Sequence, residues 1–208
     1  MQDVSRIPTT WADAKGIIYP QLRSMERHKQ ELEDMPHRVL FDMAVCYYLR
    51  MDIKDKEMEI FQIPYELMEM WKCTEEELFE TAVHNMIDEG DVSFANIQKF
   101  ISEEEDIEVG RDIPDMYVLS NKCKINGAGS ILYKEFMRLL GDLFDGNYLI
   151  LPTSIHELII VPVRDVDVDI QEFYQTLADG NDSRTLDHEV LSYTVYKYDR
   201  RKNEIVIA

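Results

Sequence analysis

The sequence predicts an α+β protein in which helices pack on a mostly antiparallel sheet. Three observations indicate this class: alternating apolar residues typical of strands, capped amphipathic segments typical of helices, and short wholly apolar runs typical of central strands. We expect a single domain over residues 1–208, with a helix-rich portion at 1–110 and a sheet-rich portion at 111–208. An acidic helical region is expected near the middle of the chain.

The first element expected is a helix over residues 10–30. Thr10 is a typical helix-capping residue, and Ile18, Leu22 and Met25 then recur at the spacing of one helical face. A Met-Pro step further on ends the apolar pattern, because the residue before a proline disfavours helical backbone.

Two strands are expected after this helix. Residues 38–50 alternate strictly between apolar residues and a mixed set, which predicts one long strand. A buried helix remains an alternative for so apolar a run. Residues 57–63 are expected to form the antiparallel partner of this strand, with the turn at Asp52–Lys56.

Helices are expected in the stretch that follows. Pro64 opens a short helix, and Thr74–Glu77 form a capping box ahead of an amphipathic helix that Gly90 ends. Residues 93–101 predict one more short helix. Residues 102–112 are polar and acidic, which is typical of a loop.

The second half of the chain is predicted to be mostly strands. Its expected elements are, in order, a strand at Met116–Ser120, a turn at Asn126–Gly129, a returning strand at Ile131–Tyr133, a helix at Lys134–Phe144, strands at Tyr148–Leu151 and Leu158–Val161, a helix from Asp169 to near Gly180, and a hairpin of residues 190–199 with 204–207. The two wholly apolar runs favour central strands that are covered on both faces.

Size and charge exclude several classes of protein. The chain has 208 residues, and its 45% hydrophobic content is enough for a packed core. Its 41 acidic and 22 basic residues give a net charge of −19, which excludes direct nucleic-acid binding through a basic face. No apolar run reaches the roughly 18–20 residues of a membrane-spanning helix, so no membrane partner is expected.

The compartment is predicted from cysteine usage and from the first residues. Cys46, Cys73 and Cys123 are odd in number and widely spaced, which indicates neither a disulfide framework nor a zinc site. Residues 1–20 are polar and mixed in charge, unlike a secretion signal. We therefore expect a cytoplasmic protein with reduced thiols.

Several segments are similar to a known bacterial family. They are MPHRVLFDMAVCYYLRM, the Trp71–Asn85 segment, MYVLSNKCKINGAGSILY, YLILPTSIHELIIVP and EVLSYTVYKYDR. In these segments the chain resembles a family that is known only as a domain of unknown function. The family is common in gut clostridial genomes and is often carried on mobile elements. The resemblance covers roughly residues 30–200. It implies a bacterial or phage protein, and it transfers no catalytic residue.

A short polar cluster is the candidate for catalysis. Ser154, His156 and Glu157 form an S-x-H-E pattern, and Ser154 and His156 would share a face on a strand. A hydrolase would need the serine hydroxyl within hydrogen-bond reach of the imidazole, and a third group to orient the ring. The pattern lacks a G-x-S-x-G elbow, so a turn whose side chains bind backbone groups is the competing interpretation.

Neither a metal nor a cofactor is predicted. The five histidines include no pair four residues apart and no H-E-x-x-H motif. Asp165, Asp167 and Asp169 imitate the start of a calcium loop, but Ile170 and Thr176 stand where that loop needs Gly and Glu.

Acidic residues are concentrated around the middle of the chain. Residues 1–110 carry 25 acidic and 11 basic residues, whereas residues 111–208 carry 16 and 11. Within residues 75–110, twelve acidic residues accompany a single base, Lys99. They are Glu75, Glu76, Glu77, Glu80, Asp88, Glu89, Asp91, Glu103, Glu104, Glu105, Asp106 and Glu108. Helix capping accounts for about two of them, and crowding of the others costs stability through self-repulsion.

This acidic cluster favours a non-catalytic binding protein. Carboxylates four positions apart on a helix recur every ~6 Å, comparable with phosphates along a nucleic-acid strand. We hypothesise a nucleic-acid mimic that inhibits a basic partner, such as a restriction or CRISPR nuclease, in an anti-restriction or anti-CRISPR role. Two alternatives remain open: an interaction module whose acidity only keeps it soluble, and a small hydrolase that uses Ser154 and His156.

Overall fold

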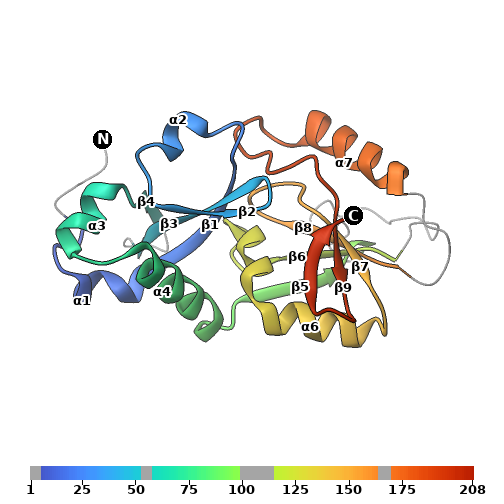
Figure 1. The fold of residues 1–208 in the computed structure, drawn as a ribbon, viewed down its shortest axis with the longest axis horizontal. Coiled ribbons are helices and arrows are strands. Elements are labelled where there is room, and N and C mark those ends of the chain that lie inside the picture. The colour runs from blue at the N-terminus through green and yellow to red at the C-terminus, as the bar shows by residue number, and fades with distance from the viewer. Residues whose placement is uncertain (1–5, 53–57, 99–114, 164–169) are drawn as a thin grey trace. The chain divides into compact units, whose positions relative to one another are not determined.

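Two antiparallel sheets form the framework of the chain (Figure 1). The structure is a computed structural model that describes residues 6–52, 58–98, 115–163 and 170–208. The chain divides into two compact units, Met1–Gly90 and Asp91–Ala208, and each contains one sheet together with helices. The predicted α+β class is therefore confirmed, while the single domain over residues 1–208 stays a prediction.

The first unit is organised around one central strand. Its elements are α1 (Trp11–Ala14), the 3₁₀ helix η2 (Lys15–Ile17), β1 (Ile18–Ser24), α2 (Lys29–Leu32), β2 (His37–Leu40), β3 (Met43–Asp52), β4 (Met58–Gln62), α3 (Tyr65–Trp71) and α4 (Glu75–Asp88). β1 pairs with one edge of β3, and β2 and β4 follow each other along its other edge, all antiparallel. The pairing of β4 with β3 confirms the predicted partner strand. Residues 53–56 of the turn expected between them, and residue 57 of the expected partner strand, lie outside the described residues.

The helix expected over residues 10–30 is wrong for most of its length. Thr10 caps only α1, where its hydroxyl accepts a backbone N–H at 3.3 Å, and β1 follows. Ile18 and Leu22 are buried in this strand, because a spacing of four residues returns to the same face of a strand as well as of a helix. Pro20, which has no N–H to donate, is tolerated because β1 is an edge strand.

The long strand expected at residues 38–50 is a hairpin of β2 and β3. Its turn consists of Phe41 and Asp42, between the paired residues Leu40 and Met43. Phe41 has a φ of 59°, a left-handed conformation that costs a bulky residue about 1–2 kcal/mol. No glycine or asparagine marks the turn, so the apolar pattern continues through it.

The two helices that follow β4 confirm the prediction. α3 begins directly after Pro64. At the start of α4, the Thr74 hydroxyl accepts the Glu77 N–H at 3.2 Å, and the Glu77 carboxylate accepts the Thr74 N–H at 2.7 Å. Gly90 follows the helix with a φ of 60°, as expected for a residue that ends it.

The described residues of the second unit form a six-stranded sheet. Its elements are β5 (Val92–Asn96), β6 (Tyr117–Asn121), the 3₁₀ helix η4 (Gly127–Leu132), α6 (Lys134–Leu143), β7 (Tyr148–Leu151), β8 (Leu158–Pro162), α7 (Ile170–Arg184), β9 (Tyr196–Asp199) and β10 (Glu204–Ile207). The strand order is β10-β9-β7-β8-β6-β5, and all neighbours are antiparallel. β6, α6, β7 and β8 confirm predicted elements, and β9 and β10 confirm the closing hairpin.

Two helices cover opposite faces of this sheet. Leu149 and Leu151 of β7 pack with Leu177 of α7. Tyr148, which points the other way, donates its hydroxyl to the backbone oxygen of Met137 in α6 at 2.8 Å. Because both faces are covered, the central strands are apolar throughout.

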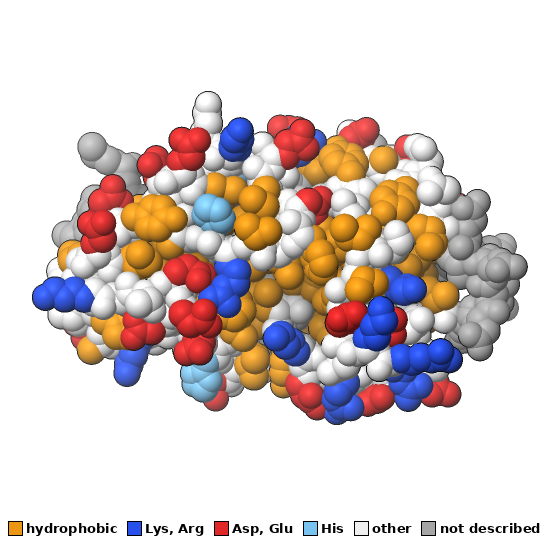
Figure 2. Space-filling view, viewed as in Figure 1, with side chains coloured by type: hydrophobic (Ala, Val, Ile, Leu, Met, Phe, Trp, Pro, Cys, Tyr) orange, Lys and Arg blue, Asp and Glu red, His pale blue; other side chains and the backbone are white. Residues whose placement is uncertain are grey.

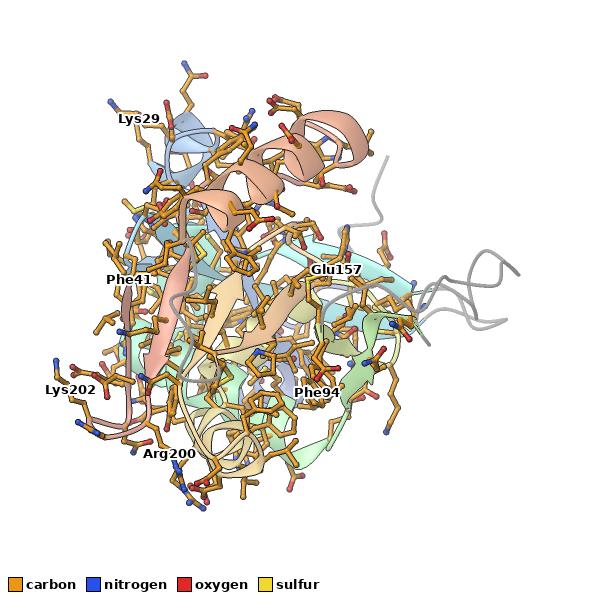
Figure 3. The ribbon with its side chains drawn as sticks, turned by 90° about the vertical axis from the view of Figure 1, so that its right-hand side faces the viewer. Lys29, Phe41, Phe94, Glu157, Arg200 and Lys202 are labelled. Carbon is orange, nitrogen blue, oxygen red and sulfur yellow. The ribbon has the colours of Figure 1, made fainter. Side chains whose placement is uncertain are left out.

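Aromatic rings fill the space between α6 and the sheet. Phe94, labelled in Figure 3, stacks on Tyr117 at a centroid distance of 4.9 Å. Phe144 links Tyr117 to Tyr148 at 5.4 and 5.8 Å, and Tyr148 stacks on Tyr198 at 4.9 Å. The row of rings therefore joins β5 at one edge to β9 near the other.

Three expectations for this unit need correction. The helix expected at residues 93–101 is wrong over residues 93–96, because β5 pairs there with β6; residues 97 and 98 are helical, and residues 99–101 lie outside the described residues. The turn and returning strand expected at residues 126–133 form η4 instead. α7 continues past Gly180, since a single glycine weakens a helix without ending it. Its expected capping residue, Asp169, is not among the described residues.

Candidate functional site

The acidic residues of α4 are divided between two faces of the helix. Successive residues are about 100° apart around a helix. This places Glu75 and Glu89 near the buried residues Leu78 and Ala82, on the side that packs on the sheet. The opposite third of the circumference, the outward face of α4, consists of Glu76, Glu77, Glu80, His84 and Asp88, and all five are exposed.

The first turn of α4 is joined to the sheet by the Arg38 cluster. It consists of Arg38, Tyr47, Glu75, Glu76 and Phe79. The Arg38 guanidinium donates to Glu75 at 2.9 and 3.3 Å and to Glu76 at 2.7 Å. It also lies 3.8 Å from the centroid of the Phe79 ring, and the Tyr47 hydroxyl donates to Glu75. Two of the predicted partner-binding carboxylates are therefore engaged within the molecule.

Burial and hydrogen bonding act against each other on the Glu75 carboxylate. Burial raises its pKa, but the hydrogen bonds from Arg38 and Tyr47 and the charge of Arg38 lower it more, so the pKa of Glu75 is below its ordinary value. The pKa of Tyr47 is raised by burial and by the hydrogen bond to Glu75. At neutral pH Glu75 is thus an anion and Tyr47 a neutral donor.

The other end of α4 is joined to the sheet by the Arg50 cluster, which consists of Tyr19, Arg50 and Glu89. Arg50 donates to both oxygens of Glu89, at 2.6 and 2.8 Å. It also donates to the Tyr19 hydroxyl at 2.6 Å and lies 3.9 Å from the centroid of that ring. Burial raises the pKa of Tyr19, so this hydroxyl stays neutral. Both ends of α4 are therefore held by an arginine that is paired and stacked.

The sequence carried a signal for these two clusters. Arg38 and Arg50 are cations at the two ends of a strongly apolar stretch. A charged side chain that leaves such a stretch toward a core needs a partner of opposite charge. The sequence did not show which acidic residues would be these partners, because that depends on where α4 packs.

The remaining members of the acidic cluster have different surroundings. The side chain of Glu76 is 64% exposed despite its ion pair, and the Glu77 carboxylate closes the capping box. Glu80 and Asp88 make no ion pair with a described residue. Asp91 belongs to the second unit, where it lies 3.6 Å from Lys122. The other predicted residues lie outside the described part of the chain: Glu103, Glu104, Glu105, Asp106 and Glu108.

Positive and negative side chains are mixed on the visible surface. On the face shown in Figure 2, many Asp and Glu side chains have Lys or Arg beside them. Four of the twelve predicted partner-binding residues stay together and exposed in the described structure, on the outward face of α4: Glu76, Glu77, Glu80 and Asp88.

Ser154, His156 and Glu157 form a turn between β7 and β8. The Ser154 hydroxyl accepts the backbone N–H of His156 at 3.1 Å. Among the described residues the imidazole bonds elsewhere, to the Asn126 N–H at 3.2 Å and to the Glu189 carboxylate at 3.2 Å. The backbone oxygen of Glu157 accepts the Ser154 N–H. The structure thus brings the three residues together without the hydroxyl-to-imidazole bond that a nucleophile pair uses.

Metal-ligating side chains do not converge in the described part of the chain. Over residues 6–52, 58–98, 115–163 and 170–208, no three His, Cys, Asp or Glu residues form a group that could hold a metal ion. The calcium-like Asp165, Asp167 and Asp169 lie outside these ranges. Within the same ranges, no helix has the length and apolar character needed to cross a membrane.

Fold and site together define an α+β protein with two antiparallel sheets, in which arginines tie an acidic helix to the first sheet. The chain belongs to a family described as "Family of unknown function (DUF5688)", which matches residues 2–200. The predicted resemblance to a domain of unknown function is therefore confirmed. No curated protein and no solved structure matches the chain.

Proposed function

We propose that this protein is a non-catalytic binding protein that contacts a basic partner through the outward face of α4. The observation that carries the proposal is the division of acids on this helix. Glu75 and Glu89 form ion pairs with Arg38 and Arg50. Glu80 and Asp88, in contrast, make no ion pair with a described residue. The free carboxylates therefore have no stabilising role that the described structure accounts for.

The dimensions of this face suit a cationic groove. From Glu76 to Asp88 the helix rises about 18 Å, and its carboxylates recur on one side. Such a row resembles the charge pattern of a nucleic-acid strand, so a cleft of Lys and Arg that binds phosphates would accept it. The proposed partner is a DNA- or RNA-binding defence protein of the restriction or CRISPR nuclease type.

The two arginine clusters support this role because they fix the helix. Arg38 holds the first turn of α4 and Arg50 holds its last turn, so the outward carboxylates keep their spacing before any partner binds. Rigid presentation lowers the ordering cost of binding. Association would be steered by charge, and it would weaken as salt increases.

Charge reversal on the outward face tests the proposal. A panel of restriction and CRISPR nucleases is assayed for DNA cleavage and for binding to the chain at low and high salt. Wild type is expected to inhibit a nuclease in competition with DNA. The double variant Glu80→Lys and Asp88→Lys is expected to bind about tenfold more weakly.

A matched control separates position from net charge. Glu66 and Glu69 are exposed on α3, and reversing both changes the net charge by the same amount. This control is expected to bind as wild type does. Equal binding by the two reversed variants, whether both are weakened or both unchanged, would contradict a role for the outward face of α4.

A further inference from the structure

The His156 imidazole lies where three connections of the second unit meet. The ring belongs to the turn between β7 and β8, the turn in which Figure 3 labels Glu157. Its Nδ1 is 3.2 Å from the backbone nitrogen of Asn126, which precedes η4. Its Nε2 is 3.2 Å from Glu189, in the connection from α7 to β9. These residues, Asn126, His156 and Glu189, are named the His156 junction.

The hydrogen bonds of the His156 junction specify one form of the ring. A backbone N–H can only donate, so His156 Nδ1 must offer a lone pair to Asn126. A neutral imidazole then carries its hydrogen on Nε2, from where it donates to the Glu189 carboxylate. A ring protonated on both nitrogens cannot accept from Asn126.

The surrounding backbone leaves little room for adjustment. Ile155 donates its N–H to the backbone oxygen of Glu189 at 2.9 Å and accepts the Ala128 N–H at 3.2 Å. The backbone oxygen of His156 accepts the Ser120 hydroxyl at 2.7 Å. At Gly127, a Cβ would lie only 2.5 Å from that same oxygen. The loop before η4 therefore cannot slide past the ring to find a new partner.

The three connections that meet at the junction carry charged residues. From the connection to β9, Glu189 faces the ring, and the imidazole of His188 lies 3.8 Å from the same carboxylate. Glu157 follows His156 in the turn, and Lys122 and Lys124 belong to the loop between β6 and η4. The His156 side chain is 30% exposed, so solvent can supply a proton.

We propose that the His156 junction is a pH-sensitive lock on the loop that leads into η4. In the neutral form the ring holds both this loop and the connection to β9. When the ring takes a proton from solvent at Nδ1, two N–H groups face each other and the bond from Asn126 is lost. The contact with Glu189 becomes an ion pair and is retained. Acidification thus removes the contact of the ring with the loop before η4 and keeps its contact with the connection to β9, while the bond from Ala128 to Ile155 remains.

Hydrogen exchange at the Asn126 amide tests the proposal on the full chain. When the pH is lowered from roughly 8 to 5, the protection factor of this amide is expected to fall about tenfold in wild type. In His156→Asn the amide oxygen replaces Nδ1 as an acceptor at every pH, so protection should stay constant. The matched control His188→Asn should behave as wild type. An unchanged wild-type protection factor, or the same fall in His156→Asn, would overturn the proposal.

A second variant keeps the test decisive if His156→Asn does not fold. Glu189→Gln retains a hydrogen-bond acceptor for Nε2 but removes the negative charge that attracts the protonated ring. The fall in Asn126 protection is then expected to begin at a lower pH than in wild type. A fall at the wild-type pH would show that the ring does not control this amide, and the lock would be rejected.

Discussion

The arginines of the two units differ in their surroundings. In the first unit, Arg38 and Arg50 bind acids 37 and 39 residues away in sequence, and each arginine also stacks on an aromatic ring. In the second unit, Arg138 binds Glu135 and Asp142 on its own helix at the surface. Arg200 binds the distant Asp142 and Asp145, also at the surface and with no ring stacked on it among the described residues. Packing at Gly127 and the hydrogen bonds of the His156 junction connect other distant segments of this unit. A cluster of charge in the sequence therefore does not reveal whether it holds the fold together.

The largest expected effect is in the second unit, at Gly127. A methyl group there would lie 2.2 Å from the Ser120 hydroxyl oxygen and 2.7 Å from the backbone nitrogen of Asn121, and backbone cannot move cheaply. Gly127→Ala is expected to destabilise the protein by about 3 kcal/mol, measured by urea unfolding. The control is Gly180→Ala, which has nothing within 4 Å and lies in α7. This control should stabilise by about 0.5–1 kcal/mol.

The second effect concerns the first unit and its long-range arginine. Arg38→Ala removes the ion pairs to Glu75 and Glu76 and leaves a partly buried carboxylate without its cation. A loss of about 2 kcal/mol is expected in urea unfolding. Both tryptophans, Trp11 and Trp71, belong to this unit, so tryptophan fluorescence reports on its unfolding. An unchanged midpoint would show that the Arg38 cluster does not hold α4.

A pH titration sharpens the role of Glu75. Its pKa is lowered in the folded state, so its ionised form contributes stability that is present at neutral pH. This contribution is lost as the pH falls through the folded pKa. The stability difference between wild type and Glu75→Gln should therefore shrink from neutral pH toward about pH 3. A difference that stays constant over this range would contradict the assignment.

The smallest effect is expected for the local ion pairs of the second unit. Arg138 lies at the surface, and its partners are three and four residues away. Arg138→Ala should change the unfolding free energy by less than about 0.5 kcal/mol, because exposed pairs are screened by solvent and salt. If this substitution cost as much as Arg38→Ala, the comparison between the two units would fail.

Some elements could be predicted from the sequence because the interactions that form them lie between residues close together in the chain. The capping box of Thr74 and Glu77 needs only residues within one helical turn, and the structure confirms it. The wholly apolar runs of β7 and β8 were likewise assigned to strands. In both cases the pattern and its structural consequence lie in the same short segment.

Other elements could not be predicted because their cause is distant. β1 has a spacing of apolar residues that suits a helix equally well, and pairing with β3 decides in favour of the strand. Phe41 occupies a turn position that glycine or asparagine would normally announce. The β5 segment is a strand because its backbone pairs with the edge of β6.

The candidate site divides in the same manner. Residue patterns along the chain were enough to predict the α+β class, the helix that carries the acids and the excess of acidic over basic residues around it. The packing of α4 on the first sheet turns Glu75 and Glu89 toward arginines and leaves Glu80 and Asp88 facing solvent, and no residue pattern indicated this. The two kinds of feature differ in the sequence separation over which their causes act. Helix capping and periodicity act between neighbours along the chain, whereas an ion pair forms only where folding brings its two charges together.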